Sequence, residues 1–560
     1  MSPVSPVSPV ARVQAALARI DEVDRPEVWI SLRQPDDLLE EARQVDERLL
    51  AGERLPLAGL LAAVKDNIDV AGLPTTAGAP SYSYEPAADA TAVARLRAAG
   101  AIVLGKTNLD QFATGLVGTR SPYGAVRNAW DPARISGGSS SGSAVATALG
   151  IVDVALGTDT AGSGRVPAAL NALVGVKPTR GLIPTTGVVP ACRTLDCVTV
   201  FARELGLARR VVGLLSGTDG TDPLAREDHP GRLLPPAPRV GVPAGEHLEG
   251  LAPGWREAFE TTVDQLRSAG VEVVEVDITP LLEAAQLLYG GAFVAERTAA
   301  VGDHIAAHRD LVGSDLDPTV AHIVMAGGKV SAIDVYRDQE RLQHLGQRGL
   351  AFLDDCSALL TPTTTNHPTL AEVAADPVGA NSRLGRYTNF ANLLDCSSLA
   401  VPAGAVDGLP FGVMLTGSAY DDRLLAELAA LLRPSVELLV VGAHLSGQPL
   451  NRQLVAAGGS LVGPVATAAV YRLHALDTDP PKPGLERVAA GGGEIAGELW
   501  RLPPAGFAAF VAALPAPMAI GPTQLADGRT VPGFTCETVA LQGATDITAY
   551  AGWRAFLARS

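Results

Sequence analysis

Residues 157–165 read Gly-Thr-Asp-Thr-Ala-Gly-Ser-Gly-Arg, which places Ser163 in a glycine-rich turn, and the run Gly-Gly-Ser-Ser-Ser-Gly-Ser at residues 137–143 precedes it. A serine hydroxyl is a weak nucleophile at its ordinary pKa. It needs a nearby base and backbone N–H donors for the oxyanion that forms on attack. Glycines beside Ser163 would let such N–H groups come close to the reacting atoms. The pattern therefore favours an acyl-transfer site.

Each segment also has a simpler reading. A Gly/Ser-rich run is commonly a flexible loop. Residues 138–142 fit G-x-S-x-G, the nucleophile elbow of α/β-hydrolases, with Ser140 as the nucleophile. Lys65 follows the apolar residues 60–64, and such a lysine commonly ends a strand and reaches into water. Taken one at a time, the segments leave these alternatives open.

Taken together, the segments around Lys65, Ser139 and Ser163 resemble the amidase signature family. The match continues through Ala-Gly-Ser-Gly-Arg-Val-Pro-Ala at residues 161–168 and Gly-Val-Lys-Pro-Thr at residues 175–179. It covers roughly residues 20–430. The resemblance implies that Ser163 is the nucleophile, Ser139 a proton relay in a cis peptide, and Lys65 the base. It also makes the elbow match at Ser140 a coincidence.

This triad makes physical demands. A lysine that acts as a base must be neutral, and burial lowers a lysine pKa, which is consistent with the apolar residues before Lys65. The turn after the strand would donate backbone N–H groups to the oxyanion. The residues expected there are Thr160, Ala161, Gly162 and Ser163. Ala161 stands where the family frequently has glycine.

The composition of the chain limits the classes of binding partner that are expected. The chain has 560 residues, 44 Lys and Arg against 60 Asp and Glu, and a net charge of −16, which argues against nucleic acid or an anionic membrane as a partner. No apolar run of 18 residues indicates a membrane span. Residues 1–10 repeat Ser-Pro-Val and are typical of an extended tail, not of a signal peptide.

Five scattered cysteines without a C-x-x-C pair indicate reduced thiols and a cytoplasmic location. The nine histidines do not cluster with other ligand residues, so no metal site is expected. Since no phosphate-binding glycine motif lies between a strand and a helix, the enzyme is expected to need no cofactor.

The order of the elements predicts an α/β fold. Residues 91–100 have a helical pattern, residues 101–104 and 151–157 read as buried strands, and a helix is expected to start at residues 108–113. Residues 239–243 and 271–278 read as strands around a helix at residues 255–269. We expect a layered amidase domain, a mixed sheet covered by helices, at residues 20–433. Residues 1–19 would hold the Ser-Pro-Val tail and the start of an N-terminal helix.

A second, smaller α+β domain is predicted at residues 434–560. Strands are expected at residues 436–441, 469–473, 487–489 and 494–502, with one clear helix at residues 504–514. Three short motifs resemble the C-terminal domain of allophanate hydrolases: Val-Gly-Ala-His-Leu at residues 441–445, Gly-Glu-Leu-Trp at 497–500 and Gly-Trp-Arg at 552–554. Residues 110–115 and 381–383 of the amidase region also resemble that subfamily.

Allophanate, or urea-1-carboxylate, is a small anion with a terminal amide. In allophanate hydrolases a Tyr and an Arg eight residues apart hold the carboxylate, and Tyr289 and Arg297 have that spacing here. Eight residues is slightly over two helical turns, so both side chains are expected on one face of one helix. Spacing alone would favour a core tyrosine and a surface arginine, and the resemblance reverses this reading.

The resemblance implies an amidohydrolase that releases ammonia from allophanate and leaves N-carboxycarbamate, which the second domain decarboxylates. His444 is the candidate there, with His474 as an alternative. The resemblance also implies a homodimer and a biotin-dependent urea carboxylase as functional partner. Two other hypotheses remain open: a broad amidase or glutaminase-type amidotransferase subunit, and a C-terminal domain that only mediates dimerisation.

Overall fold

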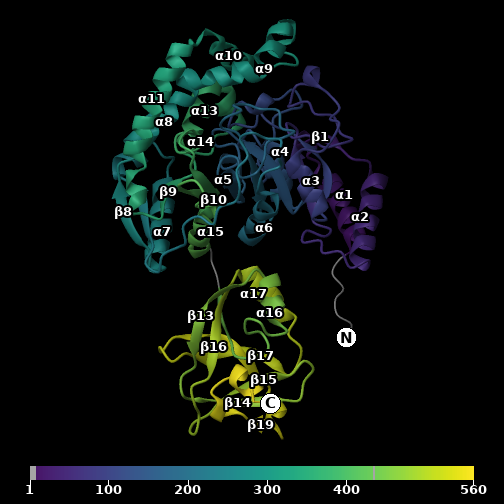
Figure 1. The fold of residues 1–560 in the computed structure, drawn as a ribbon, viewed down its shortest axis with the longest axis vertical. Coiled ribbons are helices and arrows are strands. Elements are labelled where there is room, and N and C mark those ends of the chain that lie inside the picture. The colour runs from purple at the N-terminus through teal and green to yellow at the C-terminus, as the bar shows by residue number, and fades with distance from the viewer. Residues whose placement is uncertain (1–7, 433–435, 560) are drawn as a thin grey trace. The chain divides into compact units, whose positions relative to one another are not determined.

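The computed structural model describes residues 8–432 and 436–559, and the chain divides into two compact units between Leu432 and Arg433 (Figure 1). Residues 1–7 of the Ser-Pro-Val tail lie outside the described residues. The first helix, α1 (Pro9–Val23), begins inside the predicted tail, and the Ser8 side chain accepts a hydrogen bond from the Ala11 N–H at its start. In the described ranges, no helix is both long and apolar enough to span a bilayer.

An 11-stranded mixed sheet is the centre of the first unit, in the order β1-β3-β2-β4-β6-β5-β10-β11-β9-β7-β8. β2 runs parallel to β3 and β4, whereas β6 is antiparallel to both of its neighbours, β4 and β5. The strands are β1 (Trp29–Leu32), β2 (Leu61–Lys65), β3 (Ile102–Thr107), β4 (Val154–Asp159), β5 (Val174–Lys177), β6 (Cys197–Ala202), β7 (Arg239–Pro243), β8 (Glu272–Val276), β9 (Ala358–Pro362), β10 (Ser397–Val406) and β11 (Leu409–Gly417).

Helices cover both faces of this sheet. Alternate residues of β2 point to opposite sides: Leu61 and Ala63 pack in the core with α1 and α2, while Ala62 and Val64 pack in the larger core on the other face. Because both faces are covered, the central strands are apolar throughout. The helices are α2 (Pro35–Leu50), α3 (Thr91–Ala98), α4 (Ser141–Ala148), α5 (Val166–Leu170), α6 (Leu205–Leu215), α7 (Trp255–Ser268), α8 (Thr279–Gly290), α9 (Ala295–Ala307), α10 (Pro318–Ala326), α11 (Ala332–Gly349), α12 (Leu370–Ala375), α13 (Pro377–Leu384), α14 (Asn389–Leu393) and α15 (Asp422–Leu431).

The second unit contains two smaller sheets around one apolar core. The five-stranded sheet has the order β13-β16-β12-β18-β17, and a three-stranded sheet has the order β15-β14-β19. Its elements are β12 (Val436–Val440), α16 (Asn451–Ala456), β13 (Ser460–Ala466), β14 (Tyr471–Leu476), β15 (Lys482–Arg487), β16 (Ala496–Leu502), α17 (Pro504–Ala512), β17 (Met518–Gln524), β18 (Thr530–Cys536), β19 (Thr545–Asp546) and α18 (Trp553–Leu557).

The predicted fold class is confirmed: an α/β amidase unit with a mixed sheet is followed by a smaller α+β unit. Two predicted elements are wrong. Residues 108–113 form a loop with a short 3-10 turn, since Phe112 and Ala113 have positive φ angles. The strand predicted at residues 487–489 is misplaced, because the strand β15 spans Lys482–Arg487 and the next two residues are not in a strand. The second unit also has two helices that the pattern did not indicate, α16 and α18.

Candidate active site

Lys65 is the last residue of β2, and its side chain is fully buried. Its Nζ lies 2.8 Å from Ser139 Oγ and 2.7 Å from Thr158 Oγ1. Burial lowers the pKa of Lys65 to about 7, although the charge of the buried Asp110 opposes this shift. Close to neutral pH the amine is therefore half in the neutral form that a base requires.

Ser139 follows a cis peptide bond to Gly138, as the resemblance implies. The preceding glycine is required for space, because a Cβ at Gly138 would collide with Asp110 Oδ2. The Ser139 carbonyl accepts a hydrogen bond from the Asp110 N–H at 3.1 Å. Ser139 is thus held against the loop that Asp110 begins.

Ser163 lies after β4 in the turn that leads to α5, and it is 2% exposed. Its Oγ lies 3.4 Å from the Gly115 carbonyl. Over the described ranges 8–432 and 436–559, no hydrogen bond joins Ser163 to Ser139. The structure therefore places Lys65 and Ser139 in contact, with the Ser163 hydroxyl turned toward Gly115.

The turn before Ser163 has unoccupied N–H groups. In the part of the chain that the structure describes, the N–H groups of Ala161, Gly162 and Ser163 donate no hydrogen bond. Gly162 has a φ of 147°, and a Cβ there would collide with Thr388 Oγ1. Thr160, the first residue of the turn, is tied by its hydroxyl to the buried Asp196. The turn can present N–H groups to an oxyanion.

The loop at residues 110–120 joins two parts of the site. The buried Asp110 carboxylate accepts N–H groups from Val117, Gly118 and Arg120, which fixes the loop. Within it, the Gly115 carbonyl contacts Ser163 Oγ, and Thr114 Oγ1 accepts a hydrogen bond from Arg297 Nη1 at 2.8 Å. Adjacent residues of one loop therefore link the nucleophile candidate to the arginine candidate.

Tyr289 and Arg297 are brought together, but not on one helix. Tyr289 lies on α8, which ends at Gly290, and Arg297 lies on α9 after a 3-10 turn. Arg297 Nη2 donates to Tyr289 Oη at 3.2 Å, and the guanidinium carbon lies 5.0 Å from the centre of the tyrosine ring. The prediction of a shared helical face is wrong because the chain breaks at Gly290 and Gly291 between the two residues.

The Arg297 guanidinium is 1% exposed. Among the described residues it has no carboxylate within 4.0 Å, and its Nε donates no hydrogen bond. By contrast, the equally buried Arg165 is paired with Asp159 at 2.8 Å. Since a buried charge is costly without a counter-ion, Arg297 is a candidate site for an anion.

Several residues of the site lie in segments that carried the resemblance, but their individual contacts were not predicted. Thr158 contacts Lys65 and also accepts a hydrogen bond from Asn67 Nδ2 at 3.3 Å. Thr114 holds Arg297, and Asn381 Oδ1 accepts the Leu116 N–H at 2.7 Å. Threonine and asparagine are common in loops, and these contacts join positions far apart in the chain, so spacing could not indicate them.

His444 in the second unit is buried beside aromatic rings. Its ring stacks on Phe534 with 4.7 Å between centroids, and its Nε2 lies 2.9 Å from Gln453 Oε1. Burial lowers the pKa of His444, and it borders a cavity of about 20 Å³ with Lys482. His474 lies elsewhere in this unit, with Nε2 3.0 Å from Glu486.

Glu498 joins the three sequence segments that carried the resemblance in this unit. Its carboxylate accepts hydrogen bonds from Ser446 N–H at 2.8 Å, Trp500 Nε1 at 3.1 Å and Arg554 Nη2 at 2.7 Å. Ser446 follows His444 closely, so this cluster fixes the loop that carries the histidine.

Comparison with known proteins agrees with both units. Residues 11–426 match the Amidase family, and residues 436–558 match the allophanate hydrolase C-terminal domain. The allophanate hydrolase of Kluyveromyces lactis has 39% identity and a TM-score of 0.71, and the match covers 99% of this chain and 97% of that one.

Two curated relatives differ in extent. The urea amidolyase of Saccharomyces cerevisiae is 42% identical over 94% of this chain, but the chain spans only 31% of that protein. A glutamyl-tRNA(Gln) amidotransferase subunit of Symbiobacterium thermophilum is 35% identical over 74% of this chain and 91% of its own length. The chain therefore belongs to the amidase family, and it carries an allophanate hydrolase C-terminal domain after its amidase domain.

Proposed function

We propose that this enzyme hydrolyses allophanate, releasing ammonia from the terminal amide. The observation that carries the proposal is the buried Arg297 guanidinium, which has no carboxylate partner among the described residues. A planar guanidinium binds a carboxylate through two hydrogen bonds, and the Tyr289 hydroxyl adds a third polar contact. The 110–120 loop connects this anion site to Ser163, so a small substrate could reach both.

In the proposed reaction Ser163 Oγ attacks the terminal amide carbonyl. Neutral Lys65 takes the proton through Ser139 and returns it to the departing ammonia. The Ser163 hydroxyl turns from Gly115 toward Ser139 for this transfer. N–H groups of the turn from Thr160 to Ser163 stabilise the oxyanion. Water then hydrolyses the acyl enzyme and releases N-carboxycarbamate.

The second unit is proposed to decarboxylate that product. N-carboxycarbamate takes up a proton and loses carbon dioxide, which leaves carbamate, and carbamate breaks down to ammonia and carbon dioxide. His444 is the proposed residue, because it borders a cavity that Lys482 also lines. A lysine beside the cavity suits a substrate with two carboxylates.

The test is ammonia release from allophanate beside a panel of neutral primary amides and glutamine. We expect turnover of allophanate at a kcat/KM far above that of any neutral amide. Equal turnover of neutral amides would assign a broad amidase, and a preference for glutamine would assign an amidotransferase subunit. Either result would contradict the proposed substrate.

Three further properties are proposed with this function. A urea carboxylase would supply allophanate, which the fusion implied by the name and greater length of the yeast urea amidolyase supports. The enzyme would be a homodimer in the cytoplasm, and its five unpaired cysteines suit a reducing compartment. Analytical ultracentrifugation of the full chain tests the dimer.

A further inference from the structure

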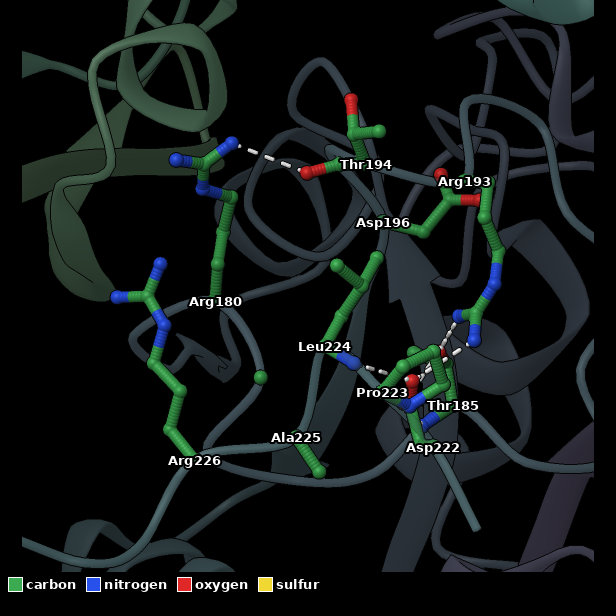
Figure 2. Close-up of a pocket in the computed structure, with 11 residues that line it drawn as sticks. Arg180, Thr185, Arg193, Thr194, Asp196, Asp222, Pro223, Leu224, Ala225 and Arg226 are labelled. Atoms are coloured by element: carbon green, nitrogen blue, oxygen red, sulfur yellow. Dashed lines mark hydrogen bonds and ion pairs between the residues drawn. The ribbon is translucent and has the colours of Figure 1, made fainter.

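A cavity in the amidase unit is lined by residues other than Ser163, Ser139 and Lys65 (Figure 2). Its volume is about 330 Å³. The lining comes from the connection between β5 and β6, residues 180–196, and from the loop after α6, residues 222–226. This volume is at the lower end of the range for small-molecule sites.

Three arginines line the cavity. Figure 2 shows Arg180 and Arg226 on one side and Arg193 on the other. Their side chains are 22%, 34% and 41% exposed, respectively. The guanidinium groups are therefore accessible to a ligand from solvent and also partly desolvated, which strengthens their attraction for an anion.

These arginines outnumber the carboxylates that pair with them. Asp395 binds both Arg180 Nε at 3.0 Å and Arg226 Nη1 at 2.7 Å. Asp222 binds Arg193 Nη2 at 2.7 Å. Arg180 and Arg226 share one carboxylate, so this pair keeps one positive charge in a protein whose net charge is −16.

Two carboxylates line the cavity, and the one other than Asp222 forms no ion pair with these arginines among the described residues. Asp196 accepts hydrogen bonds from the Thr160 hydroxyl and from the N–H groups of Ala191 and Cys192. Arg180, by contrast, keeps an unused donor: Nη1 donates to the Thr194 carbonyl at 3.0 Å, and over the described ranges Nη2 donates no hydrogen bond (Figure 2).

We propose that this cavity binds a small oxyanion, a carboxylate or phosphate, at the neighbouring guanidinium groups of Arg180 and Arg226. Two planar guanidinium groups on one side of a cavity suit an anion with several oxygens.

The wall of this cavity is shared with the proposed substrate site. Arg180 holds the Thr194 carbonyl, and the N–H and hydroxyl of Thr194 donate to Glu296 at 2.9 and 2.6 Å. Glu296 directly precedes Arg297 on α9. An anion that draws Arg180 away from Thr194 would loosen this support, so occupancy is expected to raise the KM for a carboxylate substrate.

Binding is tested by calorimetric titration of the full chain with inorganic phosphate and, separately, with succinate at low ionic strength. We expect saturable binding of at least one of them, weakened about tenfold by Arg226→Gln through loss of a charged hydrogen-bond donor. Arg180→Gln is the second variant, and Arg337→Gln, which changes an exposed arginine on α11, is the matched control. Thermal unfolding verifies that each variant is folded.

Three results would overturn the site: no binding of either anion, binding unchanged in both cavity variants, or loss of binding in Arg297→Gln alone, which would place the anion at the substrate site. Weakened anion binding in Arg180→Gln and Arg226→Gln, together with unchanged binding in Arg297→Gln and Arg337→Gln, supports the proposed anion site.

The kinetic part rests on the proposed function, whereas the binding part does not. With allophanate as substrate, the bound anion should raise KM in the wild type and in Arg337→Gln but not in Arg226→Gln. An unchanged KM in the presence of a bound anion would refute the coupling. Failure to hydrolyse allophanate at all would instead refute the proposed function and leave the calorimetric result standing.

Discussion

Lys65 Nζ lies 2.8 Å from Ser139 Oγ, and both side chains are fully buried. Thr158 holds the same amine from another side at 2.7 Å. Among the described residues, this lysine is in contact with neutral oxygens and not with a carboxylate, so burial outweighs the forces that stabilise its charge. The ammonium form is disfavoured, and the amine is kept available as a base.

The pH profile of kcat/KM should follow from this environment. Because burial lowers the pKa of Lys65 to about 7, the amine is protonated below that pH and neutral above it. We therefore expect kcat/KM to rise as pH increases through about 7 and to level off above it. Lys65→Met should lower kcat about 10²- to 10⁴-fold and abolish this step. A wild-type profile that is flat between pH 6 and 9 would contradict the role of Lys65.

Arg297→Met should separate function from stability. Removing a buried cation that has no counter-ion within residues 8–432 and 436–559 is expected to leave the melting temperature unchanged or higher. The same change should lower kcat/KM for allophanate about 10²-fold or more and affect a neutral amide much less. Differential scanning fluorimetry and the ratio of the two kcat/KM values measure these effects.

Arg165→Met is the matched control for that prediction. Arg165 is as buried as Arg297 but is paired with Asp159, so its loss leaves a buried carboxylate without its ion-pair partner. We expect destabilisation of about 3 to 5 kcal/mol. If Arg297→Met destabilised the protein as much as Arg165→Met, Arg297 would be a structural residue.

The sequence alone predicted the fold class and the family, but not the local geometry of every site residue. The segments around Lys65, Ser139 and Ser163 are short sequence motifs, and their residue patterns were sufficient to identify the fold class and the family. The sequence pointed to the Tyr289–Arg297 pair, but the prediction that both lie on one helix is wrong. The chain breaks at Gly290 and Gly291 and forms two helices there.

Long-range contacts explain the remaining differences. Residues 108–113 have a helical pattern, yet the buried Asp110 carboxylate binds three N–H groups of the following residues and imposes a loop. The partners Thr158 and Thr114 contact the site from other segments. Such contacts depend on the order of strands in the sheet, which no local pattern indicates.

Gly162→Ala should impair the oxyanion turn. At a φ of 147° a side chain is strained, and the added Cβ would collide with Thr388 Oγ1. The turn must shift, so we expect kcat to fall about 10²-fold while KM changes little. Gly213→Ala is the control, since a Cβ at this helical glycine on α6 meets nothing within 4 Å. Equal kcat values for the two variants would show that the turn does not stabilise the transition state.

Glu498→Gln should destabilise the second unit. The change leaves Arg554 and the Ser446 N–H without their charged acceptor, which costs about 1 to 3 kcal/mol. The pKa of Glu498 is lowered by its hydrogen bonds in spite of the opposing effect of burial, so this contribution is present at neutral pH and is lost as pH falls through the folded-state pKa. Urea unfolding at pH 7 and at pH 4 measures both effects.

Glu437→Gln is the control for Glu498, because Glu437 forms partly exposed ion pairs with Arg501 and Arg529 in the same unit. A change below about 1 kcal/mol is expected there. Equal losses in the two variants would mean that the Glu498 cluster does not hold the loop.

His444→Ala should change the fate of the first product without changing its formation. The histidine lies in a different compact unit from Ser163, so release of the first ammonia from allophanate should keep its wild-type rate. Burial lowers the pKa of His444, so its ring is neutral at pH 7 and can exchange a proton with a carboxylated substrate. Loss of the ring should slow carbon dioxide release, and N-carboxycarbamate should accumulate transiently in ¹³C NMR spectra. His474→Ala is the control, because the His474 ring forms a hydrogen bond with Glu486. If carbon dioxide and ammonia appeared together in both variants as in the wild type, the second unit would have no catalytic part in the reaction, and a role in assembly would be the better explanation of its presence.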